Sequence, residues 1–278
     1  MPLVSIVIPA FKPDYFKSAL ESVAVQDFND IEIYVSDDSA DDNIFQIVQA
    51  IKKHTEKTIH YIKNEPSLGE IKNHEKCLGL GESKYIKFMH DDDIIHPTLV
   101  SKQVALLHGN DIIPFATTHR YEIDKYNKLI SPERKPFLKF IREDGFLDGR
   151  SLLSFFCSKQ LNIIGEPPAL LINREHIKNL RGDAFSLFGD TFIKGWGDMS
   201  LSANLIHHSQ SGIGYVAETL YFHRYLYEKD YSCPGEALPS EVFRDQLKNM
   251  GYNLDQKFVA FQSASSGEQE NIDIFSFF

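Results

Sequence analysis

The first 116 residues alternate between short apolar runs and segments with helical spacing, and this alternation limits the fold more than any other feature of the chain. The runs are rich in β-branched residues, as expected for strands buried on both faces. They cover residues 3–8, 31–35, 58–62, 85–89 and 112–116. Strands that alternate with helices over short loops predict an α/β fold with a mostly parallel, Rossmann-like sheet flanked by helices.

The segments between these runs are expected to be helices. Asp14 is placed to cap a helix that runs to about Gln26, with Phe16, Leu20 and Val23 on one face. Pro97 suits the first turn of a later helix. The other helices are predicted at 44–51, 70–80 and 97–107.

The pattern loosens after Ala116. Residues 117–132 are expected to form a hairpin or a loop, and 263–271 a polar, mobile stretch. Helices are predicted at 149–158, 174–180, 198–207 with Gly197 as N-cap, and 240–250, and strands near 169–172 and at 213–222. The apolar residues 274–278 either pack on the body of the protein or contact a partner.

Composition excludes several classes of protein. The chain is 42% hydrophobic and 24% charged, as in an ordinary globular protein, and its net charge of -10 argues against a nucleic-acid partner. No run approaches the roughly 20 apolar residues of a membrane span. The first apolar run ends at Pro9 and lacks a basic leader, so no signal peptide is expected. Cys77, Cys157 and Cys233 are widely spaced, which favours a reducing cytoplasm and no zinc site.

Acidic residues gather where two of the predicted strands end. Asp37 and Asp38 follow the second strand, and Asp91, Asp92 and Asp93 follow the fourth. Ligands of parallel sheets bind at the carboxyl ends of strands. Clustered carboxylates repel one another, and a divalent metal with a diphosphate ligand would offset that repulsion. The alternative for the triple aspartate is a solvated turn that caps the next helix.

Phosphate-binding glycine loops are absent from the sequence. The turn after the first strand reads PAFKPD, without a dinucleotide fingerprint, and GxxxxGK[ST] and GxSxG do not occur. Hydride transfer on a dinucleotide, P-loop chemistry and a serine-hydrolase elbow are therefore excluded.

Three ordered motifs resemble the nucleotide-sugar-binding half of family 2 glycosyltransferases of the GT-A fold. They are VSIVIPAFK, IEIYVSDDSADD and SLGEIKNHEKCLGLGESKYIKFMHDDDIIHP, and they span about residues 3–110. GEPPALLINR, WGDMSL and YFHR resemble the second half of the family more weakly. The resemblance implies a GT-A sheet with an acceptor-side region toward the C-terminus.

The resemblance also implies a set of residues that contact the nucleotide sugar. Asp38 matches the carboxylate that accepts a hydrogen bond from the base, and Asp37 beside it is structural. Arg224, after His223, is expected to meet the diphosphate, with a surface arginine at a strand end as the alternative. The implied nucleotide-sugar residues are Pro9, Ala10, Phe11, Asp38, Lys72, Asn73, Asp91, Arg224 and Trp196.

The metal-binding motif departs from the family pattern. His90 stands where the DxD motif has its first aspartate, and Asp92 falls at the last position. Two registers stay open: Asp91 and Asp93 act as the pair, or Asp92 serves with help from Asp91. Asp92 is the expected ligand, with Asp93 beside it, and the metal is manganese or magnesium.

Asp198 in WGDMSL resembles the family's catalytic base, with Asp190 as the rival carboxylate. The alternative for Asp198 is an acidic residue that stabilises the start of a helix through the helix dipole. Trp196, the single tryptophan, is either core or a platform on which a sugar stacks.

The sequence therefore predicts an inverting glycosyltransferase that moves a sugar from a nucleotide-diphosphate sugar to a saccharide or lipid-linked acceptor, in surface polysaccharide synthesis. The alternatives are a non-catalytic sugar-nucleotide or glycan-binding protein of the same fold, and a nucleotidyltransferase. Residues 1–116 are expected to bind the nucleotide sugar, 117–230 to carry the acceptor site and the base, and 231–278 to form a C-terminal helix and tail. We expect a cytoplasmic protein, with peripheral contact at the inner face of the membrane, and leave its oligomeric state open.

Overall fold

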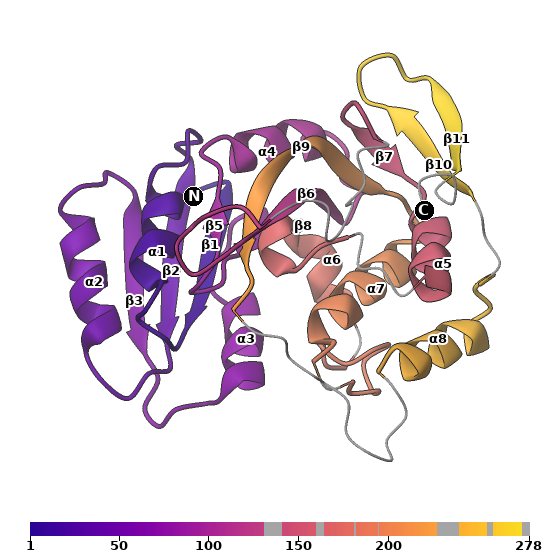
Figure 1. The fold of residues 1–278 in the computed structure, drawn as a ribbon. Coiled ribbons are helices and arrows are strands. Elements are labelled where there is room, and N and C mark those ends of the chain that lie inside the picture. The colour runs from indigo at the N-terminus through magenta and orange to yellow at the C-terminus, as the bar shows by residue number, and fades with distance from the viewer. Residues whose placement is uncertain are drawn as a thin grey trace.

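The computed structural model describes residues 1–130, 141–159, 164–180, 182–193, 195–226, 239–254 and 258–273. Within these residues eleven strands form one mixed sheet, in the order β11-β10-β7-β9-β6-β8-β4-β1-β2-β3, with β5 paired to β9 (Figure 1). The strands are β1 (Val4–Ala10), β2 (Ile31–Asp37), β3 (Thr58–Lys63), β4 (Tyr85–Phe88), β5 (Ile94–Ile95), β6 (Phe115–Ile123), β7 (Gly145–Leu147), β8 (Leu171–Asn173), β9 (Ile213–Arg224), β10 (Phe258–Ser263) and β11 (Gln269–Asp273). The helices are α1 (Phe16–Ala24), α2 (Asn43–Lys52), α3 (Glu70–Leu78), α4 (Leu99–Leu107), α5 (Gly149–Lys159), the 3-10 turn η2 (Pro167–Ala169), α6 (Arg174–Lys178), α7 (Gly197–Ser209) and α8 (Pro239–Asn249).

The first half confirms the predicted fold class. Strands β4, β1, β2 and β3 are parallel neighbours. A helix follows β1, β2 and β3, and the short strand β5 lies between β4 and α4. Every residue of β1 is buried, which explains its unbroken apolar pattern. Helices α1 and α2 lie side by side at the β3 end of the sheet (Figure 1). The parallel arrangement brings the ends of β1, β2 and β4 to one edge.

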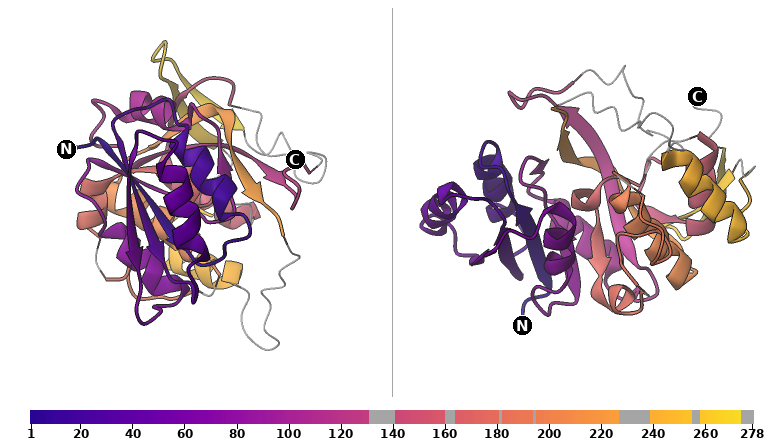
Figure 2. Two further views of the ribbon diagram at one scale, coloured as in Figure 1. Left: turned by 90° about the vertical axis from the view of Figure 1, so that its left-hand side faces the viewer. Right: turned by 90° about the horizontal axis from the view of Figure 1, so that it is seen from below.

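The second half continues the same sheet with mixed strand directions. Strand β8 lies between β4 and β6 and is antiparallel to both, while β6 and β9 are parallel. Figure 2 shows the early and the late elements on either side of the long strand β6. The strand β6 continues to Ile123, so the expected hairpin or loop does not begin at residue 117. The partners of β6 are remote in sequence, which is why its local pattern did not predict its length.

The polar stretch 263–271, expected to be mobile, contains part of two strands. Strands β10 and β11 form an antiparallel hairpin there, and β10 joins the sheet through β7. The inward residues Val259 and Phe261 alternate with exposed ones along β10. The residues of the turn and of β11 are mostly exposed and polar, so their sequence does not reveal the strand that the structure forms there.

Three expected helix starts are corrected. Tyr15, not Asp14, is the N-cap of α1, and α4 has Thr98 as its N-cap, so Pro97 lies before the helix. Helix α7 begins at Gly197, after Trp196 at the N-cap. The apolar residues 274–278 lie outside the described residues. Among the helices that the structure describes, none combines the length and the apolarity needed to cross a bilayer.

Candidate functional site

Asp91 binds the turn that follows β1. Its Oδ2 accepts hydrogen bonds of 2.8 Å from the backbone N–H groups of Phe11 and Lys12. Burial raises the pKa of Asp91, and these two bonds offset only part of that effect. The expected nucleotide contacts Pro9, Ala10 and Phe11 are thus held against the acidic motif by an aspartate of that motif.

Asp38 organises the loop before α3. One oxygen accepts from Asn64 Nδ2 at 2.9 Å and Leu68 N–H at 2.7 Å, and the other accepts from Ser67 Oγ and Gly69 N–H at 2.8 Å. Burial raises the pKa of this carboxyl, but the four donors outweigh burial and hold the pKa below its ordinary value. A direct contact between Asp38 and a base requires exchange of one of these donors.

The neighbouring polar residues are also bound by the protein. Asp37 is fully buried and accepts from Tyr61 Oη at 2.6 Å and Lys63 Nζ at 3.1 Å. The amide of Asn73 is buried, where it accepts from Asn64 and donates to the carbonyl of Ser36, both at 3.0 Å. Lys72, one residue earlier on α3, is exposed. Of the expected Lys72–Asn73 pair, the lysine is therefore the side chain that faces solvent.

Asp93 is the buried centre of the acidic motif. It accepts hydrogen bonds from Tyr221 Oη at 2.6 Å and from the backbone N–H of Arg224 at 2.7 Å. The Nδ1 atoms of His90 and His223 lie 3.4 Å and 3.3 Å from its two oxygens. Burial acts to raise the pKa of Asp93, but the two histidines hold it well below its usual range. Asp93 thus joins the motif after β4 to strand β9.

His90, Asp92 and Asp93 form a donor set for a divalent cation. One ligand atom from each residue lies within 4.8 Å of the others. Burial and the charge of Asp93 raise the pKa of Asp92. His90 Nε2 is buried and has no hydrogen-bond partner among the described residues. One imidazole and two carboxylates suit manganese and similar ions, so these residues fit a divalent metal. The structure brings Asp92 and Asp93 together and adds His90, whereas Asp91 is not part of this group.

Arg224 is buried and bound on all sides rather than aimed at open space. Its guanidinium donates to the carbonyls of Asp92 at 2.6 Å and Asp124 at 2.7 Å, and to Asn127 Oδ1 at 2.6 Å. It also lies 4.2 Å above the ring of Tyr15. This arrangement fixes the backbone at Asp92.

Asp198 lies in the first turn of α7 and is half-buried. Burial raises its pKa to about 6, although the charge of His90 acts in the opposite direction. Its carboxylate accepts no hydrogen bond from the residues that the structure describes. The rival Asp190 is exposed and accepts from the hydroxyl of Thr191 next to it. Of the two candidates, Asp198 is the one whose charge acts on the cluster, because it helps to raise the pKa of His90.

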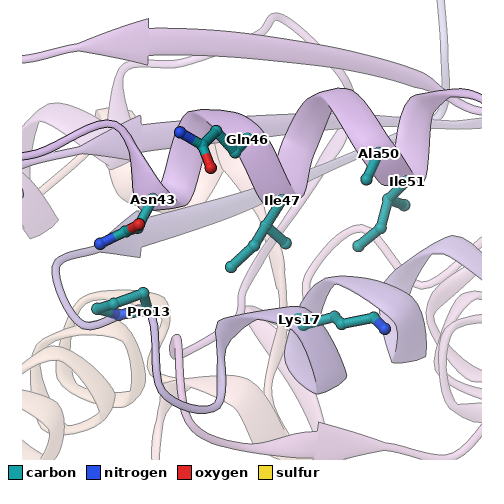
Figure 3. A pocket seen from close by; sticks show the side chains of 7 residues that line it. All are labelled: Pro13, Lys17, Asn43, Gln46, Ile47, Ala50 and Ile51. Carbon is teal, nitrogen blue, oxygen red and sulfur yellow. The ribbon is translucent and has the colours of Figure 1, made fainter.

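Trp196 is half-buried and packs on Phe243 of α8, with ring centroids 5.5 Å apart. Its ring therefore contributes to the packing of α7 on α8. A separate pocket lies between α1 and α2, where Ile47 and Ile51 of α2 point toward α1, which carries Lys17 (Figure 3). None of the residues of the acidic edge lines that pocket.

Tyr221, His223 and Glu166 were not predicted from the sequence. Tyr221 and His223 lie two residues apart on β9 and both approach Asp93, so strand alternation next to Arg224 was the available signal. No role for His74 was predicted from the sequence either, yet its ring stacks on Phe88 and its centroid lies 5.8 Å from the ring centroid of His90. Burial lowers the pKa of His74 to about 4. Glu166 forms an ion pair with Arg120 at 3.2 Å.

Residues 5–160 match the model of the family described as Glycosyl transferase family 2. A glycosyltransferase of Methanocaldococcus jannaschii is 24% identical over 66% of this chain and 59% of its own length. The Escherichia coli UDP-Glc:alpha-D-GlcNAc-diphosphoundecaprenol beta-1,3-glucosyltransferase WfaP is 31% identical over 45% of this chain and 48% of its own. The matched regions therefore span less than two thirds of these relatives.

Solved structures of low sequence identity share the fold. Staphylococcus aureus TarS 1-349 in complex with UDP-GlcNAc has a TM-score of 0.59 at 16% identity, over 89% of this chain and 65% of that one. The mannosyltransferase PcManGT from Pyrobaculum calidifontis, in complex with GDP-Man and Mn2+, has a TM-score of 0.55 at 15% identity, over 83% of this chain and 58% of that one. The sheet is thus of the GT-A type predicted from the motifs.

Proposed function

Because this chain belongs to glycosyl transferase family 2, we propose that it is an inverting glycosyltransferase that uses a nucleotide-diphosphate sugar. The observation that carries the proposal is the grouping of His90, Asp92 and Asp93, whose ligand atoms lie within 4.8 Å of one another and suit a divalent cation. The half-buried Asp198 is near enough for its charge to act on His90. Asp198 can act as a proton acceptor, and the set His90, Asp92 and Asp93 can hold a metal that binds a diphosphate leaving group. In this proposal residues 1–116 bind the donor, 117–230 carry the acceptor site and the base, and 231–278 complete the C-terminal side.

Asp92 and Asp93, with His90 beside them, would hold the divalent ion, manganese or magnesium. A bound ion of this kind neutralises a diphosphate and stabilises it as a leaving group. The chain's own contribution is to hold the donor atoms: Arg224 binds the carbonyl of Asp92, and Tyr221 binds Asp93. In this arrangement Arg224 acts on the diphosphate site through the backbone of Asp92.

The donor nucleotide would lie over the ends of β1 and β2. The turn Pro9–Ala10–Phe11, held by Asp91, forms one wall, and the loop held by Asp38 forms another. Lys72 is exposed beside that loop and is available to the phosphates, while Asn73 stabilises the loop from beneath. Asp38 therefore contributes to nucleotide binding chiefly by shaping the loop 67–69.

Asp198 would take the proton from the acceptor hydroxyl as that oxygen attacks the anomeric carbon from the face opposite the diphosphate. A single displacement inverts the anomeric centre and needs no covalent enzyme intermediate. A raised pKa strengthens the carboxylate as a base, in keeping with the burial of Asp198. Trp196 supports α7 through its packing on Phe243 of α8.

The acceptor is a saccharide or a lipid-linked saccharide. Support comes from the names of two relatives, WfaP and the Campylobacter jejuni GalNAc(5)-diNAcBac-PP-undecaprenol beta-1,3-glucosyltransferase, which is 30% identical over 34% of this chain. Such an acceptor places the protein in polysaccharide synthesis, in the cytoplasm at the inner face of the membrane.

A thermal-shift panel tests the proposal. The probes are UDP-glucose, UDP-GlcNAc and GDP-mannose, each with and without manganese, and a ligand at 100 times its Kd adds roughly 2.7 kcal/mol of stability. Product analysis with the best donor then separates the classes: free nucleoside diphosphate supports sugar transfer, pyrophosphate supports nucleotidyl transfer, and binding without turnover supports a binding protein.

A further inference from the structure

Beyond the end of strand β6 the chain forms a tight hairpin, residues 124–130, which we call the β6 hairpin. The N–H of Asp124 donates to the carbonyl of Lys128 at 2.9 Å. The Asp124 carboxylate accepts from the N–H groups of Tyr126 at 2.8 Å and Lys128 at 3.0 Å. Asn127 takes a φ of 61°, which asparagine adopts more readily than most residues. These bonds hold the tip of the hairpin in a defined shape.

The side chains at this tip point away from the core. Tyr126 is 69% exposed and Leu129 is 60% exposed. Lys125 and Lys128 are exposed as well, and the Lys125 ammonium lies 5.0 Å from the centre of the Tyr126 ring. One short hairpin therefore presents an aromatic ring, an aliphatic side chain and two cations to the surroundings.

The β6 hairpin projects from the edge of the sheet that carries the candidate site. Strand β8 is antiparallel both to β4 and to β6, so β4 and β6 run in the same direction and end at the same edge. The acidic motif follows β4, and the hairpin follows β6. In the right-hand view of Figure 2 the chain beyond β6 extends away from the body of the protein.

Arg224 connects the hairpin with the candidate metal site. Its guanidinium donates to the carbonyl of Asp124 at 2.7 Å and to Asn127 Oδ1 at 2.6 Å. The same guanidinium donates to the carbonyl of Asp92 at 2.6 Å, and Asp92 belongs to the cation-binding set. A surface that contacts the tip of the hairpin therefore lies beside that set.

The charge of the tip differs from that of the chain. The protein has a net charge of -10, so an anionic surface repels it except where cations gather. The acidic residue of the hairpin, Asp124, is engaged by backbone N–H groups, whereas Lys125 and Lys128 are exposed. Tyrosine and leucine flanked by lysines suit the boundary between anionic lipid headgroups and acyl chains.

We propose that the β6 hairpin docks on the anionic surface of a lipid bilayer and holds the acidic edge of the sheet against it. The choice of a membrane as partner rests on the proposed function, because a lipid-linked acceptor is reached at a bilayer surface. Tyr126 and Leu129 enter the interface, and Lys125 and Lys128 contact lipid phosphates. The tip of the hairpin has no part in donor binding.

Co-sedimentation of the full chain with lipid vesicles tests the proposal. The vesicles consist of phosphatidylcholine alone or of phosphatidylcholine mixed with phosphatidylglycerol. One variant, Tyr126→Ser with Leu129→Ser, removes the apolar side chains, and a second, Lys125→Gln with Lys128→Gln, removes the cations. All four positions are exposed, so both variants should fold, and thermal melts check this.

Two controls make the same chemical changes elsewhere. Ile112→Ser removes a side chain that is 72% exposed and precedes β6, at the opposite end of that strand from the hairpin. Lys52→Gln with Lys53→Gln removes two exposed lysines at the end of α2. These controls separate the position of the hairpin from a general loss of apolarity or of positive charge.

We expect the wild type and both controls to sediment with the anionic vesicles and to bind phosphatidylcholine more weakly. The apolar variant should bind the anionic vesicles about tenfold or more weakly, and the lysine variant about fivefold more weakly for each lysine removed. A wild type that stays in the supernatant, or hairpin variants that sediment as it does, would overturn the inference. Self-association that the hairpin variants lose, without any vesicle binding, would assign the hairpin to a contact between copies and would also overturn it.

Thermal shifts with UDP-glucose, UDP-GlcNAc and GDP-mannose separate this inference from the proposed function. Hairpin variants that keep the donor-induced shift of the wild type and lose vesicle binding support both. A wild type that responds to a donor but ignores vesicles overturns the docking surface and leaves the proposed function standing. A wild type that binds vesicles through the hairpin but responds to no donor supports the docking surface and contradicts the proposed function.

Discussion

Tyr221 donates a hydrogen bond of 2.6 Å to Asp93 across a separation of 128 residues. The bond joins the strand β9 to the motif that follows β4, and both side chains are fully buried. The geometry of the candidate metal site is therefore set by both halves of the chain at once.

Tyr221→Phe removes this donor without changing the packed ring. A hydrogen bond to a charged group contributes about 1.5–3 kcal/mol, so the melting temperature should fall. Affinity for manganese should fall as well, because Asp93 loses a group that orients it. Tyr34→Phe is the matched control: it removes a 3.0 Å bond to Glu32, which lies outside the cation-binding set. Equal manganese affinity in both variants would show that Tyr221 does not contribute to metal binding.

Donor binding should depend on a divalent metal. Calorimetry with the nucleoside diphosphate, first with manganese and then with a chelator, should show a loss of affinity when the metal is removed. Asp92→Asn should weaken the metal-dependent part about tenfold or more, judged by the effects of altered metal sites. If affinity is the same with chelator as with manganese, the metal has no place in donor binding.

Asp198→Asn should abolish sugar transfer and leave donor affinity nearly unchanged. An amide keeps the size of the side chain and suits a helix start, but it cannot accept the proton of the acceptor. General-base contributions run from about 100- to 10,000-fold, so turnover should fall by at least the lower factor. Asp190→Asn is the control. If only Asp190→Asn loses turnover, then Asp190 and not Asp198 is the base.

The pH dependence of turnover should report the same carboxyl. Burial raises the pKa of Asp198 to about 6, and only the ionised form acts as a base. Turnover should therefore decline about tenfold per pH unit as the pH falls below about 6, and should level off above it. The measurement is kcat/KM from pH 5 to 8 with saturating manganese. A flat profile over this range would show that no group with such a pKa serves as the base.

Asp38→Ala should lower stability as well as nucleotide affinity. The carboxylate accepts four hydrogen bonds, and its removal leaves Leu68 N–H and Gly69 N–H without their acceptor. The free energy of unfolding should fall by about 1.5–3 kcal/mol or more. Because the folded-state pKa of Asp38 is lowered, its contribution is present near neutral pH and is lost as the pH falls through that pKa. Denaturant unfolding at pH 7 and at about pH 2, below the lowered pKa, should show a smaller difference between variant and wild type at the lower pH.

Local patterns predicted the first half of the fold because its strands are buried runs and its helices are amphipathic. They predicted a strand at 112–116 but not the extension of β6 to Ile123, because its neighbours β8 and β9 come much later in the chain. The hairpin β10–β11 was missed for a different reason: its turn and the exposed residues of β11 are mostly polar, and the pairing of β10 with β7 is not visible in sequence.

The sequence predicts where the candidate site lies, but not which residue of the acidic motif makes which contact. The positions of Asp91, Asp92 and Asp93 at a strand end are readable from the chain, whereas their partners are not. Asp91 holds the turn at Phe11, Asp93 binds Tyr221, and only the folded arrangement shows this. Glu166 stands in a loop before a short strand, and two prolines after it were the one sequence signal of a rigid turn.

The position of β8 between β4 and β6 has a consequence for engineering. Residues 1–116 of this chain end before the strand that covers β4, so they do not form a cassette that can be joined to the second half of a relative. A functional chimera must also carry over the residues of β8 that pair with Tyr85 and Ile86. If the proposed function holds, donor and acceptor specificities are better exchanged by single side chains and loops than by halves.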